Sequence, residues 1–212
     1  MDAAFWHSKW EQRHIAFHEG EVNSMLARHL NRLGLSEGAR LFLPLCGKTR
    51  DIAWLLDQGH PVVGVELSEM AVKELFEELD VVPQVSEHAG MRVYQADGLD
   101  IFVGDLFDLT AEMLGTVDAI YDRAALVALP PPMRARYVPQ VVSISGGVPV
   151  LLITFEYDQQ LLDGPPFSVE EAEVRALYGD SHDVTSLQIE DIEGGFKGKV
   201  AAINRAWLMT LA

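Results

Sequence analysis

A glycine turn and an acidic residue stand about twenty residues apart in the first half of the chain, and each follows a short apolar run. Gly47 comes after residues 40–45, and Glu66 ends residues 61–66. In open α/β sheets, ligands bind beyond the carboxyl ends of the strands, where both positions would lie. An acid at a strand end is by itself more often a solvated turn residue. At this spacing after a glycine turn, Glu66 predicts a carboxylate that accepts hydrogen bonds from the hydroxyls of an adenosine ribose.

The turn after the first run reads Leu45-Cys46-Gly47-Lys48 and contains one glycine. A dinucleotide site needs Gly-x-Gly-x-x-Gly, because backbone amides must approach a pyrophosphate closely. S-adenosylmethionine has a ribose but no phosphate, so a turn with one glycine can hold it. The turn therefore favours S-adenosylmethionine over NAD as the cofactor. An NAD-dependent oxidoreductase is further disfavoured because the chain has no Tyr-x-x-x-Lys pair.

Trp6 and Trp10 stand four positions apart near the N-terminus, so a helix would place both rings on one face, and Phe17 follows. Aromatic residues in this arrangement most often belong to a core, because large rings bury well. These residues precede the first predicted strand, however, where the sheet does not require them. An aromatic face also suits a sulfonium cation and a flat acceptor. We therefore expect residues 1–33 to form a helical lid.

Arg123 directly follows the apolar run of residues 117–122, at the edge where a ligand is expected. A guanidinium in that place can form a forked contact with a carboxylate, such as that of the methionine part of the cofactor. The alternative is a surface ion pair with Asp118 or Asp122. The binding interpretation is the favoured one.

We predict no metal site. His14 and His18 have the spacing of a helical metal pair, but no third ligand and no glutamate of a His-Glu-x-x-His motif accompanies them. Cys46 is the one cysteine of the chain, so an internal disulfide and a zinc ribbon are excluded. We expect Cys46 to be a small buried residue and not a nucleophile.

Composition and charge limit the partners. The 212 residues are 49% hydrophobic and 23% charged, which is typical of a globular domain. A net charge of −16 argues against nucleic acid and against an anionic membrane surface. The chain has no signal peptide pattern and no run of about 18 apolar residues. We expect a cytoplasmic monomer whose partner is a small molecule.

Apolar runs alternate with amphipathic stretches, and this order predicts one α/β domain with a doubly wound, mostly parallel sheet. It would comprise residues 1–212, with the lid in residues 1–33 and the α/β core in residues 34–212. The last two strands would form an antiparallel edge pair. The predicted strands are residues 40–45, 61–66, 91–95, 100–103, 117–122, 148–157, 185–192 and 201–209, and the predicted helices are residues 49–58, 68–79, 130–143 and 169–177.

Separated segments from Trp6 to about Tyr178 carry a resemblance to a known family. They are residues 6–10, 16–18, 44–48, 59–66, 122–128 and 164–167. On these segments the chain resembles the thiopurine S-methyltransferase family, particularly its bacterial members. The resemblance implies the class I fold of S-adenosylmethionine-dependent methyltransferases, and transfer of a methyl group to the sulfur of a small molecule.

The resemblance also implies roles for individual residues. Leu45 would lie against the cofactor, Glu66 would hold its ribose, and Trp10 would close over it. Asp105 and Leu106 occupy the position that contacts the adenine. Phe17 would face the acceptor, and Arg123 would stand between cofactor and acceptor, touching both.

The acceptor stays open at this point. In residues 190–199 the chain has Lys197 and Lys199, where mammalian members carry an arginine that helps to hold the acceptor. Thiopurines, aromatic thiols, and selenium or tellurium species linked to oxyanion resistance are all compatible acceptors, and so is a protein that binds the cofactor without catalysis. Because the cofactor is already activated and soft nucleophiles lose a proton readily, we predict that no single side chain is an indispensable acid or base.

Overall fold

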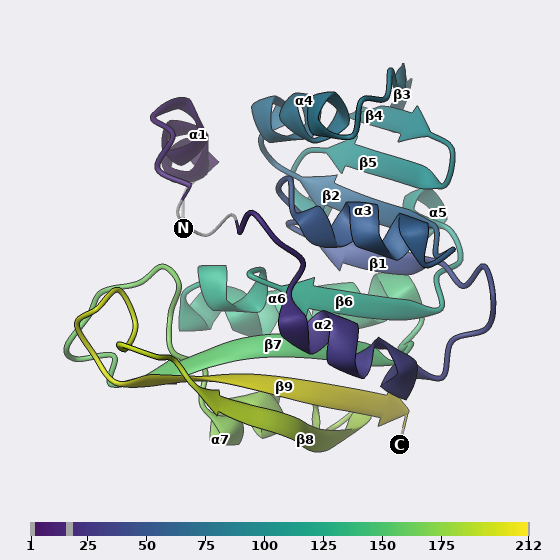
Figure 1. Cartoon of the computed structure of the whole chain (residues 1–212). Coiled ribbons are helices and arrows are strands. Elements are labelled where there is room, and N and C mark those ends of the chain that lie inside the picture. The colour runs from purple at the N-terminus through teal and green to yellow at the C-terminus, as the bar shows by residue number, and fades with distance from the viewer. Residues whose placement is uncertain (1–2, 16–18, 212) are drawn as a thin grey trace.

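The apolar runs of the sequence form the centre of a nine-stranded sheet in a computed structural model, which describes residues 3–15 and 19–211 (Figure 1). The strand order is β3-β4-β5-β2-β1-β6-β7-β9-β8. In chain order the strands are β1 (Leu41–Pro44), β2 (Val62–Glu66), β3 (Gln84–His88), β4 (Met91–Ala96), β5 (Leu99–Val103), β6 (Ala119–Arg123), β7 (Val150–Tyr157), β8 (His182–Asp191) and β9 (Ala202–Leu211).

The five central strands, β5-β2-β1-β6-β7, are parallel, and the pairs at both flanks are antiparallel. Strand β9 pairs antiparallel with β7 and with β8 at the C-terminal edge. The expected doubly wound, mostly parallel sheet with an antiparallel C-terminal strand is therefore confirmed. Strand order reverses between β1 and β6, so the crevice above these two strands is where this class of sheet binds ligands.

Helices cover both faces of the sheet (Figure 1). Side chains from α2, α3 and α4 pack on one face, and side chains from α5, α6 and α7 pack on the other. The helices are α1 (Ala3–Glu11), α2 (Ser24–His29), α3 (Arg50–Asp57), α4 (Glu69–Glu78), α5 (Ala111–Leu114), α6 (Pro131–Ser145) and α7 (Glu171–Tyr178), with 3₁₀ turns at Leu30–Leu33, Leu106–Asp108 and Leu126–Ala128.

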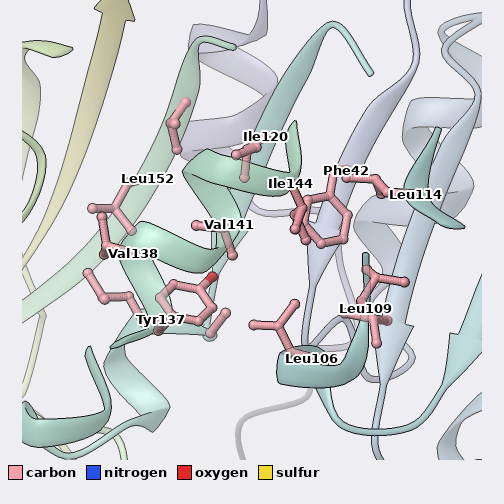
Figure 2. Close-up of a cluster of buried hydrophobic side chains, with 14 of the residues drawn as sticks. Phe42, Leu106, Leu109, Leu114, Ile120, Tyr137, Val138, Val141, Ile144 and Leu152 are labelled. Atoms are coloured by element: carbon pink, nitrogen blue, oxygen red, sulfur yellow. The ribbon is translucent and has the colours of Figure 1, made fainter. Parts of the chain in front are cut away.

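The two faces of the sheet bury separate apolar clusters. Figure 2 shows the cluster beneath α6, where Val138, Val141 and Ile144 of the helix lie near Phe42 and Ile120 of β1 and β6. These strands are buried on both faces, which explains why their sequences are continuously apolar. The two clusters fix the central strands, and with them the edge from which the site residues emerge.

Within residues 1–33 the two helices have different surroundings. Met25 and Leu26 of α2 are 2% and 0% exposed and belong to the cluster that also contains residues of α3 and α4. In contrast, α1 stands apart from the sheet, near α4 (Figure 1). Of the expected lid, α2 is thus part of the core packing, and α1 is the part that lies over the ligand edge.

Strand β3 is not among the predicted strands. Every residue of Gln84–His88 is exposed, so the segment lacks the apolar alternation by which a strand is recognised. It forms because β4, whose residues Met91, Val93 and Tyr94 are buried, offers a free edge after a tight turn.

Candidate functional site

The turn after β1 has an unusual backbone. Leu45 and Gly47 have φ values of 49° and 54°, in the left-handed region that side chains other than glycine rarely adopt. The turn is joined to β2 by a hydrogen bond from the Cys46 N–H to the Val65 carbonyl, at 3.2 Å. Strained backbone of this kind is frequent at functional sites. The partly exposed Leu45 is thereby placed at the carboxyl edge of the sheet, as expected.

Glu66 joins the first two βα turns. Its side chain is nearly buried, at 6% exposed, and its two oxygens accept hydrogen bonds from the Gly47 N–H at 2.9 Å and the Ser68 N–H at 2.7 Å. Burial raises the pKa of Glu66, against the opposing effect of the Ser68 and Gly47 N–H groups. Each carboxylate oxygen has a second lone pair, so both oxygens can still accept a ribose hydroxyl. These acceptor oxygens, beside a turn with one glycine, fit a nucleoside that has no phosphate.

Trp10 covers the glycine of this turn. The indole is 2% exposed, and a Cβ placed on Gly47 would come within 3.3 Å of its Cζ2 atom. The ring of α1 therefore rests directly on the turn that carries the candidate cofactor contacts. The structure thus places Trp10 at the turn after β1, and its closing over the cofactor stays a prediction.

Ion pairs hold the end of α1 against α4. Lys48 of the turn lies 2.9 Å from Glu74 and 2.6 Å from Glu78. Arg13, just beyond α1, also pairs with Glu74. The same carboxylate thus receives one cation from the N-terminal segment and one from the turn. Burial acts to raise the pKa of Glu74, but these cations hold it below its ordinary value.

Asp105 and Leu106 follow β5, the neighbour of β2. The Gly104 N–H donates to the carbonyl of Glu66 at 3.0 Å, which brings this corner beside the ribose candidate. Asp105 is exposed, and its Oδ1 accepts the Phe107 N–H at 3.0 Å. Leu106 is 2% exposed and points into the core (Figure 2). Asp105 is therefore open to a ligand, whereas the Leu106 side chain is occupied with packing.

Arg123 ends β6 and is paired with an acid that the sequence did not indicate. Its Nη2 lies 2.7 Å from an oxygen of Glu19, and the Arg123 side chain is 10% exposed. The alternative partners are engaged elsewhere. Asp122 accepts the Tyr137 hydroxyl at 2.6 Å, and Asp118 accepts the Arg40 N–H at 2.7 Å. Glu19 lies so far from Arg123 along the chain that no local spacing could have identified the pair.

Asp51 connects the N-terminal segment to the sheet. It is fully buried in the first turn of α3, where Oδ1 accepts the Asn23 N–H at 2.8 Å and Oδ2 accepts the Tyr121 hydroxyl at 2.9 Å. Burial, with the Asp51 charge adding to it, raises the pKa of Tyr121 well above its ordinary value, so the hydroxyl stays a donor. Asp51 was missed in the sequence because an acid in a first helical turn usually faces solvent and the helix dipole.

Asp122 is a buried carboxylate directly before Arg123. Burial raises the pKa of Asp122 from 3.8 to about 6, although the Tyr137 hydroxyl and the Leu126 N–H lower it in part. Because the folded protein holds this proton more tightly than the unfolded chain, the stabilising contribution is fully present below pH 3.8 and is lost as pH rises through 6.

We expect Asp122→Asn to remove this pH dependence. Asparagine can accept the Leu126 N–H and donate to the Tyr137 oxygen, so the variant should fold. Relative to the variant, the wild type should lose up to about 3 kcal/mol of unfolding free energy between pH 4 and pH 7. Urea unfolding of both proteins across this range measures the difference. Parallel pH profiles would contradict the assignment.

The end of β7 and the loop that follows it form another part of this edge. The Phe167 N–H donates to the Val127 carbonyl at 2.7 Å, which holds the loop after β7 against the turn that follows Arg123. Phe196 stacks on Tyr157 with ring centroids 5.3 Å apart. An open groove of about 820 Å³ begins here, and its charged lining residues are acidic: Glu156, Asp158, Glu170 and Asp191.

Residues 190–199, where a difference from mammalian family members is expected, lie near this loop. Lys197 donates to the carbonyl of Pro165 at 3.4 Å and so sits over the loop after β7. Phe17, the residue expected to face the acceptor, lies outside the described residues, as does His18.

Among residues 3–15 and 19–211, no group of three or more His, Cys, Asp or Glu side chains is placed to share a metal ion. No helix in this same part of the chain combines the length and apolar character needed to cross a bilayer.

Comparisons with known proteins identify the family and the fold. The family model described as thiopurine S-methyltransferase matches residues 1–207. A thiopurine S-methyltransferase of Xanthobacter autotrophicus is 52% identical over 100% of both chains, and one of Teredinibacter turnerae is 48% identical over 99% of this chain and 98% of its own.

Among solved structures, a Burkholderia thailandensis 1,6-didemethyltoxoflavin N1-methyltransferase with bound S-adenosylhomocysteine has a TM-score of 0.65 at 17% identity, covering 98% of this chain and 87% of its own. A Methanosarcina mazei S-adenosylmethionine-dependent methyltransferase has a TM-score of 0.64 at 15% identity, covering 90% of this chain and 99% of its own. At these identities the two structures show a shared fold.

Proposed function

The chain belongs to the thiopurine S-methyltransferase family, and from this premise we propose that it transfers the methyl group of S-adenosylmethionine to the sulfur of small aromatic thiols, thiopurines among them. The observation that carries the proposal is the buried Glu66 carboxylate, which bridges the turns after β1 and β2, beside the switch point of the sheet. A carboxylate so placed, beside a turn with one glycine, suits the ribose of a nucleoside without phosphate.

The cofactor-binding groups would hold the cofactor in place and shield it from water. S-adenosylmethionine, when bound, supplies a methyl group already activated on a positively charged sulfur. Glu66 would accept hydrogen bonds from the ribose hydroxyls, and Asp105 and Leu106 would border the adenine, Leu106 through its backbone. Leu45 would support the cofactor from below, and the Trp10 ring would exclude water above the turn.

Orientation of the acceptor would fall to Arg123 and Phe17. Arg123 ends β6 at the switch point, and its guanidinium is held in place by burial and by Glu19. We propose no acid or base at the reacting sulfur, because an aromatic thiol loses its proton readily and its anion is a soft nucleophile. Positioning and exclusion of water then account for the rate.

We further propose that residues 1–212 act as one domain and one monomer in the cytoplasm, with α1 as the lid. The contact between Trp10 and Gly47 and the ion pair from Arg13 to Glu74 support this arrangement of α1. The net charge of −16 supports the monomer, since copies of the chain repel each other.

Labelled methyl transfer tests the function. The protein is incubated with methyl-labelled S-adenosylmethionine and, separately, thiophenol, 6-mercaptopurine, selenite, tellurite and phenol. We expect label in the thioether products and none in anisole, because the phenol oxygen is a harder nucleophile. Calorimetry with S-adenosylhomocysteine runs alongside. Binding without label in any product would indicate a protein that senses the cofactor and would overturn the proposal.

A further inference from the structure

The ion pair between Arg123 and Glu19 joins the reaction edge to the N-terminal segment. Arg123 is nearly buried, at 10% exposed, while the Glu19 side chain is 52% exposed. The guanidinium is therefore fixed and the carboxylate comes to it from the solvent side. Any anion that approaches Arg123 from solvent must replace Glu19 or lie beside it.

Two other cations near this edge are already paired with carboxylates and are not free to bind an anion. Lys48 is paired with Glu74 and Glu78, and Arg13 is also paired with Glu74. The groove at the end of β7 has acidic charged residues in its lining. The net charge of −16 adds a negative field over the whole molecule. Arg13, Lys48 and Arg123 are thus paired with the chain's own carboxylates, whereas Lys197 contacts a backbone carbonyl.

We propose that Glu19 is a specificity-determining residue, which directs the enzyme to uncharged acceptors by occupying Arg123. This inference rests on the proposed function and adds the charge class of its substrate. A neutral aromatic thiol leaves the Glu19–Arg123 pair intact and packs against it. A thiol that carries a carboxylate either displaces Glu19, losing the existing pair, or meets its negative charge at short range.

Specificity of this kind is a difference between two substrates, so the test needs a matched pair. 4-Mercaptobenzoate is anionic, and its methyl ester has the same ring and thiol without the charge. Wild-type protein should favour the ester in kcat/KM at saturating S-adenosylmethionine. In Glu19→Gln the freed guanidinium can bind the carboxylate, and we expect the anion-to-ester ratio of kcat/KM to rise roughly tenfold.

Two variants and one binding measurement complete the test. Glu21→Gln, two positions further along the same segment, changes the net charge equally and should leave the ratio at its wild-type value. Glu19→Asp keeps the charge and should remain closer to wild type than Glu19→Gln. Calorimetry with the methylated products, 4-(methylthio)benzoate and its methyl ester, in the presence of S-adenosylhomocysteine should show the same shift in relative affinity without any turnover.

The outcomes separate the two proposals. If wild type methylates neither thiol, the proposed function fails, while the product affinities still report on Glu19. If both thiols are methylated and Glu19→Gln leaves both ratios unchanged, or if Glu21→Gln shifts them equally, the specificity role of Glu19 is overturned.

Discussion

Replacing Glu66 with alanine should weaken the affinity for S-adenosylhomocysteine about 100-fold, which corresponds to about 2.7 kcal/mol. Hydrogen bonds to a charged acceptor are worth about 1.5–3 kcal/mol each, and this carboxylate would accept two of them from the ribose. The same oxygens hold the Gly47 and Ser68 N–H groups, so the variant also loosens the turns around the ligand. Isothermal titration calorimetry measures the affinity directly.

Two further variants distinguish the loss of ribose recognition from a loss of folded structure. Glu66→Gln keeps one acceptor oxygen without the charge and should fall between wild type and alanine. Glu77→Ala removes an exposed acid of α4, the helix that follows Glu66, and should bind as wild type does. Circular dichroism shows whether each variant is folded. A folded Glu66→Ala protein that binds within threefold of wild type would remove the basis for the ribose assignment.

Replacing Asp51 with alanine should produce the largest loss of stability among the changes considered, about 3 kcal/mol. The substitution leaves the Asn23 N–H and the Tyr121 hydroxyl buried without their acceptor. For a chain of this size we expect a fall in Tm of roughly 6–12 °C. The N-terminal segment should detach from the sheet, so affinity for S-adenosylhomocysteine should fall as well. Thermal unfolding and calorimetry measure the two effects.

Asp51→Asn is the matched control. Its oxygen can accept the Asn23 N–H and its amide can donate to the Tyr121 oxygen, so most of the stability should return. Tyr121→Phe in the Asp51→Ala background should cost little more, because the phenol has already lost its partner. An alanine variant as stable as wild type would mean that Asp51 does not anchor the segment.

The sequence predicted those parts of the site in which the interacting groups are close along the chain or have a periodic signal. Glu66 and Gly47 are found because strand ends and turns follow from apolar periodicity, and the spacing between them carries the chemistry. The central parallel strands are found for the same reason. Their order in the sheet was not predicted, because apolar periodicity does not indicate which strands pair.

Features that depend on contacts between distant segments were not found. Glu19 meets Arg123, and Asn23 meets Asp51, only after the chain has folded back across the sheet. Neither contact has a sequence pattern, since one polar residue on a loop resembles any other. The burial of the Leu106 side chain was likewise not predicted, and its contact with the adenine, through the backbone, stays a prediction.

The contact between Trp10 and Gly47 affects the order in which parts of the chain fold during synthesis. Helix α1 leaves the ribosome before its docking surfaces, the turn after β1 and α4, and Glu19 leaves before the end of β6, with which it pairs. An isolated helix of nine residues is marginal in water, so α1 has little to stabilise it until those surfaces exist. Helix α1 thus becomes ordered only after α4 has been made, and Glu19 gains its partner only after β6 has joined the sheet.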